Sequence, residues 1–139
     1  MISLFSCTNG PIMHCYQPVN ANGWSAKDTI RFEVPIQREE LTTSLSIGVR
    51  TTDNYPYTAL HLKALICKNG KLQKEKVVRI DIYDNSGKNK GKGFLYYEHA
   101  SSFPLPLEFN ADSAYTISIV HSMKEHAING VSNVGVLIE

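Results

Sequence analysis

The chain has 139 residues, which suits one domain, and at this length roughly two thirds of the unfolded surface can be buried. Hydrophobic residues make up 42% of the sequence and charged residues 19%, and the formal net charge is +1. This composition is typical of a globular protein, and the balanced charge argues against nucleic acid as the main partner. No apolar run is long enough to span a membrane as a helix.

The N-terminal segment differs from the rest of the chain. Residues 1–6 are apolar or small but too few for a complete secretion signal, so they fit either the end of a signal or a plain N-terminal tail. Residues 8–22 are rich in Asn, Gly and Pro, which favours an irregular tether. We therefore expect a signal remnant over 1–7, a tether over 8–22 and one domain over 23–139.

Apolar and polar residues alternate along the expected domain, and this pattern predicts short β-strands. The predicted strands are 29–36, 45–50, 60–66, 78–82, 94–98, 105–109, 115–120 and 134–138. In the first strand the even-numbered residues from Ile30 to Ile36 share a face, and Pro35 predicts an edge position or a bulge because it lacks an N–H donor. Asn69-Gly70 and Asp84–Gly87 are turn signals.

One short helix is predicted before the last strand. Ser122 and Glu125 fit a capping box, and Asn129-Gly130 supplies a left-handed stop after about two turns. The whole pattern predicts an all-β fold. We expect a two-sheet antiparallel β-sandwich of Greek-key or jelly-roll type, with about eight strands and this one helix.

Three cysteines, Cys7, Cys15 and Cys67, are an odd number, so at least one stands outside any intramolecular disulfide. No C-x-x-C motif occurs, which argues against a zinc ribbon or a thioredoxin-like site. Cys67 lies in an apolar run and is predicted to be a core residue.

Two loops resemble ligand-binding motifs but lack their essential parts. Residues 87–93 alternate Gly and Lys, yet the spacing, the following Ser or Thr and the following helix of a phosphate-binding loop are missing. Asp81 and Asp84 lack the spacing of a calcium-binding loop and suit turns better. We therefore expect no metal and no other cofactor.

The sequence contains no recognisable catalytic motif. Five histidines are present, but neither H-E-x-x-H nor G-x-S-x-G occurs. The members of a catalytic triad need not be adjacent in sequence, so a hydrolase remains a third alternative. A cleft that joined Asp81 or Asp84 to a histidine would support it. The expectation is a protein without enzymatic activity.

Two aromatic features deserve an interpretation. Tyr55-Pro56-Tyr57 follows a predicted strand, and it fits either a rigid turn whose rings cap the core or a stacking platform for a sugar or peptide. We favour the first interpretation. Trp24, followed by Asp28, is interpreted as a buried tryptophan next to a turn.

Four blocks of the sequence resemble one known family when taken in order. The blocks are 22–32 (W-x-x-x-D-x-x-x-F), 49–62 (R…Y-P-Y, then L-x-L), 84–93 (D-x-x-G-K-x-x-G-K-G) and 115–136 (Y-x-I…M-K…G-V-x-N-V-G). The positions that depart from the family pattern are Ala59, Asn89, Lys124 and Asn133. With these blocks the chain resembles the gliding-motility lipoproteins, the GldH family, over residues 22–139.

The resemblance implies an exported lipoprotein of the Bacteroidota, anchored in the inner or outer membrane and facing the periplasm. Residues 4–7, Leu-Phe-Ser-Cys, then look like a truncated lipobox with Cys7 as the lipidated residue. Two or more acyl chains on that cysteine would anchor the protein stably. The family is linked to the gliding machinery and the associated protein secretion apparatus.

On this basis we expect a non-enzymatic envelope lipoprotein that acts through protein–protein contacts in a motility or secretion assembly. Arg50, Tyr55, Tyr57 and Lys92 are the candidate contact residues, because Arg and Tyr are favoured anchors at interfaces. The alternative is a carbohydrate-binding module of the envelope, in which Trp24 and Tyr57 would stack on a glycan.

Overall fold

The computed structural model describes residues 12–20, 22–93, 96–101 and 104–139, and this part of the chain consists of β-strands and connections without a helix. The strands are β1 (Met13–Pro18), β2 (Trp24–Ser25), β3 (Ile30–Val34), β4 (Leu41–Thr51), β5 (Ala59–Lys68), β6 (Lys71–Asp81), β7 (Tyr97–Ala100), β8 (Leu105–Phe109), β9 (Tyr115–His121), β10 (Ala127–Ile128) and β11 (Val131–Ile138).

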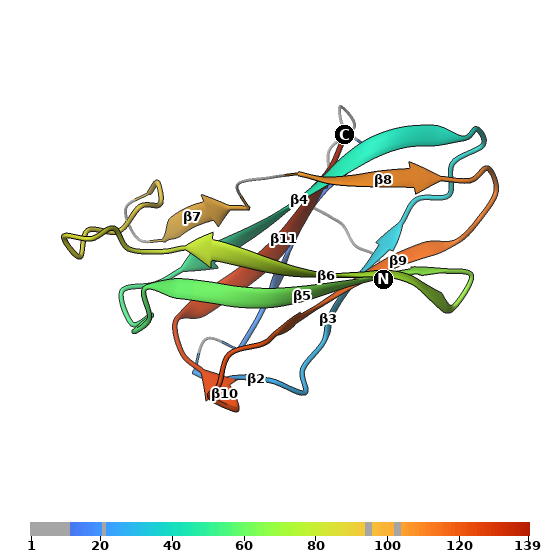
Figure 1. Ribbon diagram of the computed structural model, residues 1–139. Coiled ribbons are helices and arrows are strands. Elements are labelled where there is room, and N and C mark those ends of the chain that lie inside the picture. The colour runs from blue at the N-terminus through green and yellow to red at the C-terminus, as the bar shows by residue number, and fades with distance from the viewer. Residues whose placement is uncertain (1–11, 21, 94–95, 102–103) are drawn as a thin grey trace.

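Two antiparallel sheets face each other (Figure 1). The first has the order β1-β11-β4, and β7 and β8 then pair with opposite halves of β4. The second has the order β3-β9-β5-β6, and β2 pairs with β10 in a separate short ribbon. The predicted all-β, two-sheet antiparallel sandwich is confirmed.

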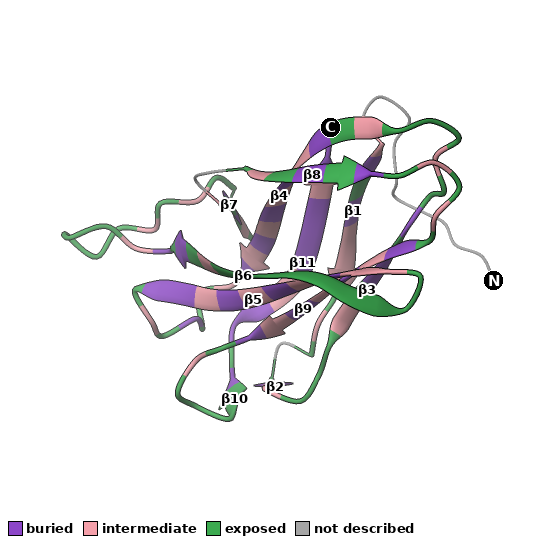
Figure 2. Ribbon diagram, turned by 45° about the vertical axis from the view of Figure 1, so that its right-hand side comes forward, coloured by how far each residue is buried: buried purple, intermediate pink, exposed green. Residues whose placement is uncertain are grey.

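The core is the layer between the two sheets. In β4, Leu45, Ile47 and Val49 are buried while the residues between them face outward, and Ile117 and Ile119 of β9 are buried from the other sheet. Figure 2 shows buried residues along the strands of both sheets. A strand turns alternate side chains to opposite faces, so the period seen in the sequence becomes one dry inner face per sheet.

The predicted edge and turn positions are also found. β3 pairs only with β9 among the described residues, so it lies at a sheet edge as predicted. β3 ends at Val34, and Ile36 is 61% exposed, so the prediction that Ile36 shares the buried face is wrong. Asn69 and Gly70 have φ values of 49° and 84°, the left-handed geometry expected for a tight hairpin between β5 and β6.

The predicted helix between β9 and the last strand is absent. The Ser122 amide donates to the carbonyl of His61, and the Met123 amide donates to Nδ1 of His121. These bonds keep the chain against the sheet until β10, where Ile128 pairs with Trp24 of β2. A capping box contributes only about 1 kcal/mol, so long-range pairing and the burial of Trp24 override it.

The tether expected over 8–22 is replaced in part by a strand. Met13–Pro18 form β1 and pair with β11 along their whole length. Met13 and Cys15 face the core, so this segment alternates as the later strands do, although Asn, Gly and Pro lie on either side of it. Residues 1–7, with the predicted lipidation site Cys7, lie outside the described residues.

Cys67 is not a core residue. Its thiol is free and the residue is half-buried, because Ile66 points into the core and the next residue of the strand points outward. The pairing of β5 with β6 also shifts between these two residues. The prediction that Cys67 is a core residue was therefore wrong, because the inward-facing residue of this pair is Ile66.

A pair of neighbouring substitutions on β9 tests the inner layer. Ile119→Ala should lower the free energy of unfolding by about 2–5 kcal/mol, because Ile119 is fully buried. Val120→Ala, on the outer face of the same strand, should lower it by less than about 1 kcal/mol. Urea denaturation measures both, and equal losses would contradict the assignment of faces.

Candidate functional site

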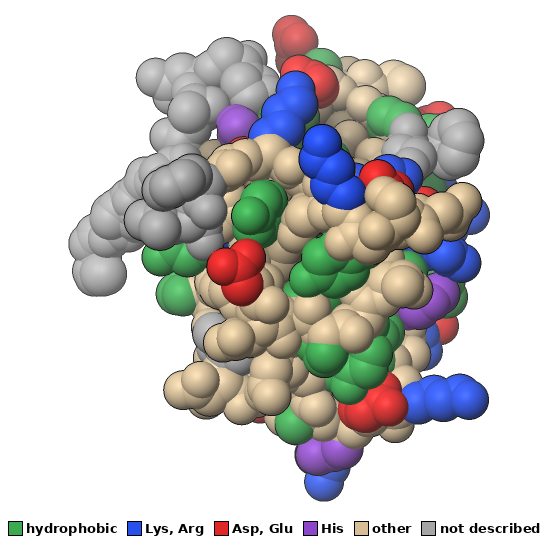
Figure 3. All heavy atoms as spheres, turned by 90° about the vertical axis from the view of Figure 1, so that its left-hand side faces the viewer, with side chains coloured by type: hydrophobic (Ala, Val, Ile, Leu, Met, Phe, Trp, Pro, Cys, Tyr) green, Lys and Arg blue, Asp and Glu red, His purple; other side chains and the backbone are tan. Residues whose placement is uncertain are grey.

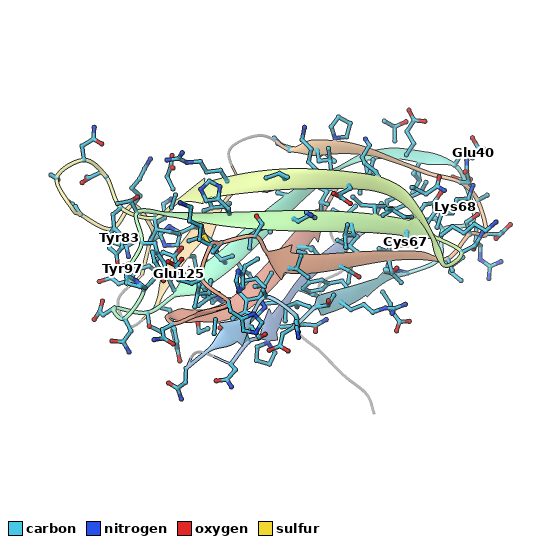
Figure 4. All side chains as sticks on the ribbon, turned by 60° about the horizontal axis from the view of Figure 1, so that its bottom comes forward. Glu40, Cys67, Lys68, Tyr83, Tyr97 and Glu125 are labelled. Carbon is cyan, nitrogen blue, oxygen red and sulfur yellow. The ribbon has the colours of Figure 1, made fainter. Side chains whose placement is uncertain are left out.

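Three connections meet at one end of the sandwich: residues 52–58 after β4, residues 82–93 after β6 and residues 122–126 after β9. Tyrosines gather there, and we call Tyr55, Tyr57, Tyr83 and Tyr97 the tyrosine end. Figure 4 shows Tyr83 and Tyr97 together with Glu125 at this end, far from Cys67 and Lys68 at the other. Figure 3 faces the same end and shows hydrophobic side chains in its centre, with acidic groups close by.

Tyr55 is the buried support of the tyrosine end. The residue is 2% exposed, and its hydroxyl donates a 2.7 Å hydrogen bond to the carbonyl of Ala59. Gly130 passes beneath it with a φ of 91°, and a Cβ placed on Gly130 would lie 2.4 Å from the Tyr55 backbone. Only glycine combines this close approach with this backbone conformation. Tyr55 is therefore held from both sides.

The other tyrosines build outward from Tyr55. The ring of Tyr57 packs edge-on against it at 5.5 Å between centroids, and the Tyr83 hydroxyl donates a 2.8 Å hydrogen bond to the Tyr55 carbonyl. Tyr57, Tyr83 and Tyr97 are each half-buried. Such rings are positioned by the core and still present part of their surface to solvent.

Acidic groups lie beside these rings. Burial raises the pKa of the Tyr57 hydroxyl, and the neighbouring Glu125 carboxylate raises it further. Burial likewise raises the pKa of Tyr83, with the charge of Asp53 as the next cause. Glu125 and Asp53 are both exposed, so the tyrosine end combines aromatic surface with two solvent-facing carboxylates.

A second arrangement lies on the outer face of the first sheet, and we call Tyr16, Arg50 and Glu98 the arginine platform. Tyr16 of β1 stands level with Gly135 of β11 and Gly48 of β4. Its ring covers both glycines: a Cβ on Gly135 would lie 2.7 Å from ring Cδ1, and one on Gly48 would lie 2.5 Å from the hydroxyl oxygen. The two glycines therefore leave the space that the ring fills.

Arg50 is held from two sides. Its guanidinium carbon lies 4.0 Å from the centre of the Tyr16 ring, and its Nε donates a 2.7 Å hydrogen bond to Oε2 of Glu98. Burial is the main cause that raises the pKa of Tyr16. Cation–π stacking and ion pairing thus join β1, β4 and β7 through one side chain.

A hollow of about 400 Å³ opens beside the arginine platform. Its lining residues are Tyr16, Asp81, Lys90, Lys92, Glu98, His99 and Ala100. Both acids in it are already paired, Asp81 with Arg79 at 2.8 Å and Glu98 with Arg50. Lys90 also lies 3.9 Å from Asp81, so Lys92 is the lining charge that has no ion pair among the described residues.

The hollow brings Asp81 and His99 into one lining, which was the condition set for a hydrolase. Asp81 hydrogen bonds with Arg79, however, and Nε2 of His99 lies 3.0 Å from Oγ1 of Thr51. Thr51 is 0% exposed, so this hydroxyl–imidazole pair is closed to a substrate. Among the described residues no three His, Cys, Asp or Glu side chains form a group that could hold a metal ion.

The candidate residues fall into two groups. Trp24 is 0% exposed, with Nε1 donating to the Asp28 carbonyl and its ring against His121, so neither Trp24 nor the buried Tyr55 offers a surface to a ligand. Trp24 thus matches the interpretation as a buried tryptophan. Tyr57 stays partly open and Lys92 is exposed, and the Lys92 backbone pairs with Glu98.

Sequence reasoning missed Tyr16, Tyr83, Tyr97 and Glu98. Each sits far along the chain from the residues that it meets, and no spacing rule links them. The seven tyrosines in the composition were the one available signal, and we used it only as an indication of β-structure. Within the described residues no helix could cross a membrane.

Removing the guanidinium of Arg50 tests the arginine platform. Arg50→Ala should lower the free energy of unfolding by about 1–2 kcal/mol, because the stack and the ion pair are lost together. Arg79→Ala is the matched control, since Arg79 pairs with Asp81 on its own strand without a stacked ring, and it should leave stability nearly unchanged. Equal effects in urea denaturation would contradict a special role of the platform.

Burial lowers the pKa of His99, and this predicts a pH dependence of stability. In the unfolded chain this histidine takes up a proton near pH ~6.5, whereas in the folded chain it takes up the proton only at a lower pH. The free energy of unfolding is therefore highest above that pH and decreases as the pH falls through it. His99→Gln should reduce the loss of unfolding free energy between about pH 7 and about pH 5. The exposed His14→Gln is the control, and an unchanged slope in His99→Gln would contradict the assignment.

Comparison with known proteins gives three findings. A family model described as "GldH lipoprotein" matches residues 11–138. The "Gliding motility lipoprotein GldH" of Flavobacterium johnsoniae is 24% identical over 152 residues, covering 99% of this chain and 90% of that protein. A family 35 carbohydrate binding module from Clostridium thermocellum is similar in structure, with 13% identity, coverage of 87% and 86% of the two chains and a TM-score of 0.38, a likeness too weak to carry an argument. The chain belongs to the GldH lipoprotein family.

Proposed function

We propose that this protein is a non-enzymatic, lipid-anchored component of a gliding-motility or associated secretion assembly in the cell envelope. It acts by protein–protein contact, and the tyrosine end is its contact surface. Membership of the GldH lipoprotein family supports the place in the envelope and the link to motility. Lipidation of Cys7 is the anchor that this proposal includes.

One observation carries the proposal: the half-buried rings of Tyr57, Tyr83 and Tyr97 sit at one end of the sandwich on the rigid support of Tyr55. Tyrosine supplies a large contact area with few rotatable bonds, so a pre-positioned tyrosine loses little entropy on binding. Tyr96 is 52% exposed and Pro56 is exposed at the same end, which extends the apolar area.

The arginine platform stiffens the neighbouring face. Glu98 of the platform follows Tyr97 directly on β7, so the position of one surface fixes that of the other. Because Arg50 is engaged with Tyr16 and Glu98, we assign it a supporting role rather than the direct contact expected from the sequence. Lys92 is exposed beside the platform and remains a candidate contact residue.

The carbohydrate-binding alternative has lost one of its two proposed rings. Trp24 has no exposed surface on which a sugar could stack. Tyr57 alone would have to supply that surface. We therefore keep protein–protein contact as the function that the geometry supports best.

Replacing the exposed rings tests the proposal. The double variant Tyr57→Ala/Tyr83→Ala, expressed in the organism's own cells, should lose most of the envelope proteins that co-purify with the wild type after cross-linking. The reason is that truncating a hot-spot residue lowers the binding free energy by about 2 kcal/mol or more. Val77→Ala is the matched control, since Val77 is 59% exposed on β6 and lies outside the three connections that form this end.

Thermal unfolding must first show that both variants are folded. A double variant that is folded and keeps every cross-linked protein at the wild-type level would refute the tyrosine end as the contact surface. Loss of the same proteins from Val77→Ala would point to β6 instead.

A further inference from the structure

We propose that the partner at the tyrosine end presents a basic segment, with an arginine or lysine side chain seated on the exposed surfaces of Tyr57 and Tyr83 between the carboxylates of Glu125 and Asp53. This inference rests on the proposed function and adds to it the chemistry of the partner. It follows from the charges, the rings and the ion pairs of the described residues.

The carboxylates at this end have no cationic partner within the described chain. Glu125 and Asp53 are exposed, and neither takes part in an ion pair among the described residues. Glu98 and Glu75 differ in this respect, because Glu98 pairs with Arg50 and Glu75 with Lys63. The two charges at the tyrosine end are therefore available to a binding partner.

The nearby lysines do not supply the missing cation. Lys90 lies 3.9 Å from Asp81, and Lys92 lines the hollow beside the arginine platform. Beyond the effect of burial, the charged groups that raise the pKa values of Tyr57 and Tyr83 are acids, whereas the pKa of Tyr16 on the platform is raised by Glu98 and lowered by Arg50. The charges that act on the Tyr57 and Tyr83 hydroxyls are therefore acidic, and Lys124, which precedes Glu125 in the chain, forms no ion pair among the described residues.

Aromatic faces and carboxylates together match a cation with an apolar stem. A guanidinium or ammonium group is attracted to the face of a tyrosine ring, and the attraction grows when the group is desolvated. The side chains of Arg and Lys also cover apolar surface with their methylene groups. Opposite charges across the interface add steering and specificity. A basic protein segment fits this surface better than an acidic or neutral one.

Capped amino acids provide a direct probe on the whole folded chain. We would titrate the isotope-labelled protein with N-acetyl-arginine amide and follow amide chemical shifts by NMR. Shifts confined to Tyr57, Tyr83, Tyr97 and their loops are expected, with weaker binding at high salt. N-acetyl-glutamate amide and N-acetyl-glutamine amide should cause no shifts at these positions.

Neutral variants of the two acids complete the test. Asp53→Asn/Glu125→Gln should weaken binding of the arginine probe about fivefold or more. Glu33→Gln is the matched control, because Glu33 is an exposed acid on β3 with no ion pair among the described residues. Unchanged binding by the acid variant, absence of shifts, or shifts located elsewhere would overturn the inference. Equal shifts with cellobiose or maltose would favour a glycan and overturn it too.

The cross-linking experiment separates this inference from the proposed function. If the ring variant loses the envelope partner but Asp53→Asn/Glu125→Gln keeps it at the wild-type level, contact at the tyrosine end stands and the basic partner does not. If both variants keep the partner, both proposals fail. If both lose it, and the loss follows the loss of arginine binding, both are supported.

Discussion

The packing of two inner sheet faces against each other is the constraint on which the rest of the molecule depends. β4 and β9 each place a row of aliphatic side chains between the sheets, and β11 adds Val134, Val136 and Ile138. This layer excludes water along the length of the strands and so fixes where each strand ends. The loops that carry the tyrosines and the acids begin where the layer stops.

The closure of one end of this layer explains the positions of the least ordinary residues. Tyr55 fills the end of the core, and Gly130 leaves the space for its backbone. Trp24 of the β2–β10 ribbon is buried, and Nε2 of His121 donates a hydrogen bond to its carbonyl. Each of these residues satisfies its own polar atom, so the end is closed without an unpaired donor from Tyr55 or Trp24. A closed end of this kind can hold partly exposed rings in fixed positions.

The arginine platform and the tyrosine end differ in whether their charged groups have partners of opposite charge within the described chain. In the arginine platform, the cation has a ring and a carboxylate, and the ring has its place over two glycines. In the tyrosine end, the rings are supported from below, but Glu125 and Asp53 have no cationic partner in the described chain. Groups that are positioned and unpaired favour an interface, whereas groups that are positioned and paired favour a structural role. For this reason we propose that Arg50 supports the fold of the platform and does not contact a partner directly.

Local patterns in the sequence determined the strands, the tight Asn69-Gly70 turn and the edge position of β3, because alternation, positive φ and the missing N–H of Pro35 act within a few residues. The four blocks also determined the family, since ordered motifs survive without knowledge of contacts. Tertiary structure alone decided that residues 122–126 are not a helix and that Met13–Pro18 form a strand. It also decided that Arg50 stacks on the ring of Tyr16 and that Glu125 lies beside Tyr57. These pairings join residues far apart in the chain, so they form only after strands that are distant in sequence have come together in the folded structure.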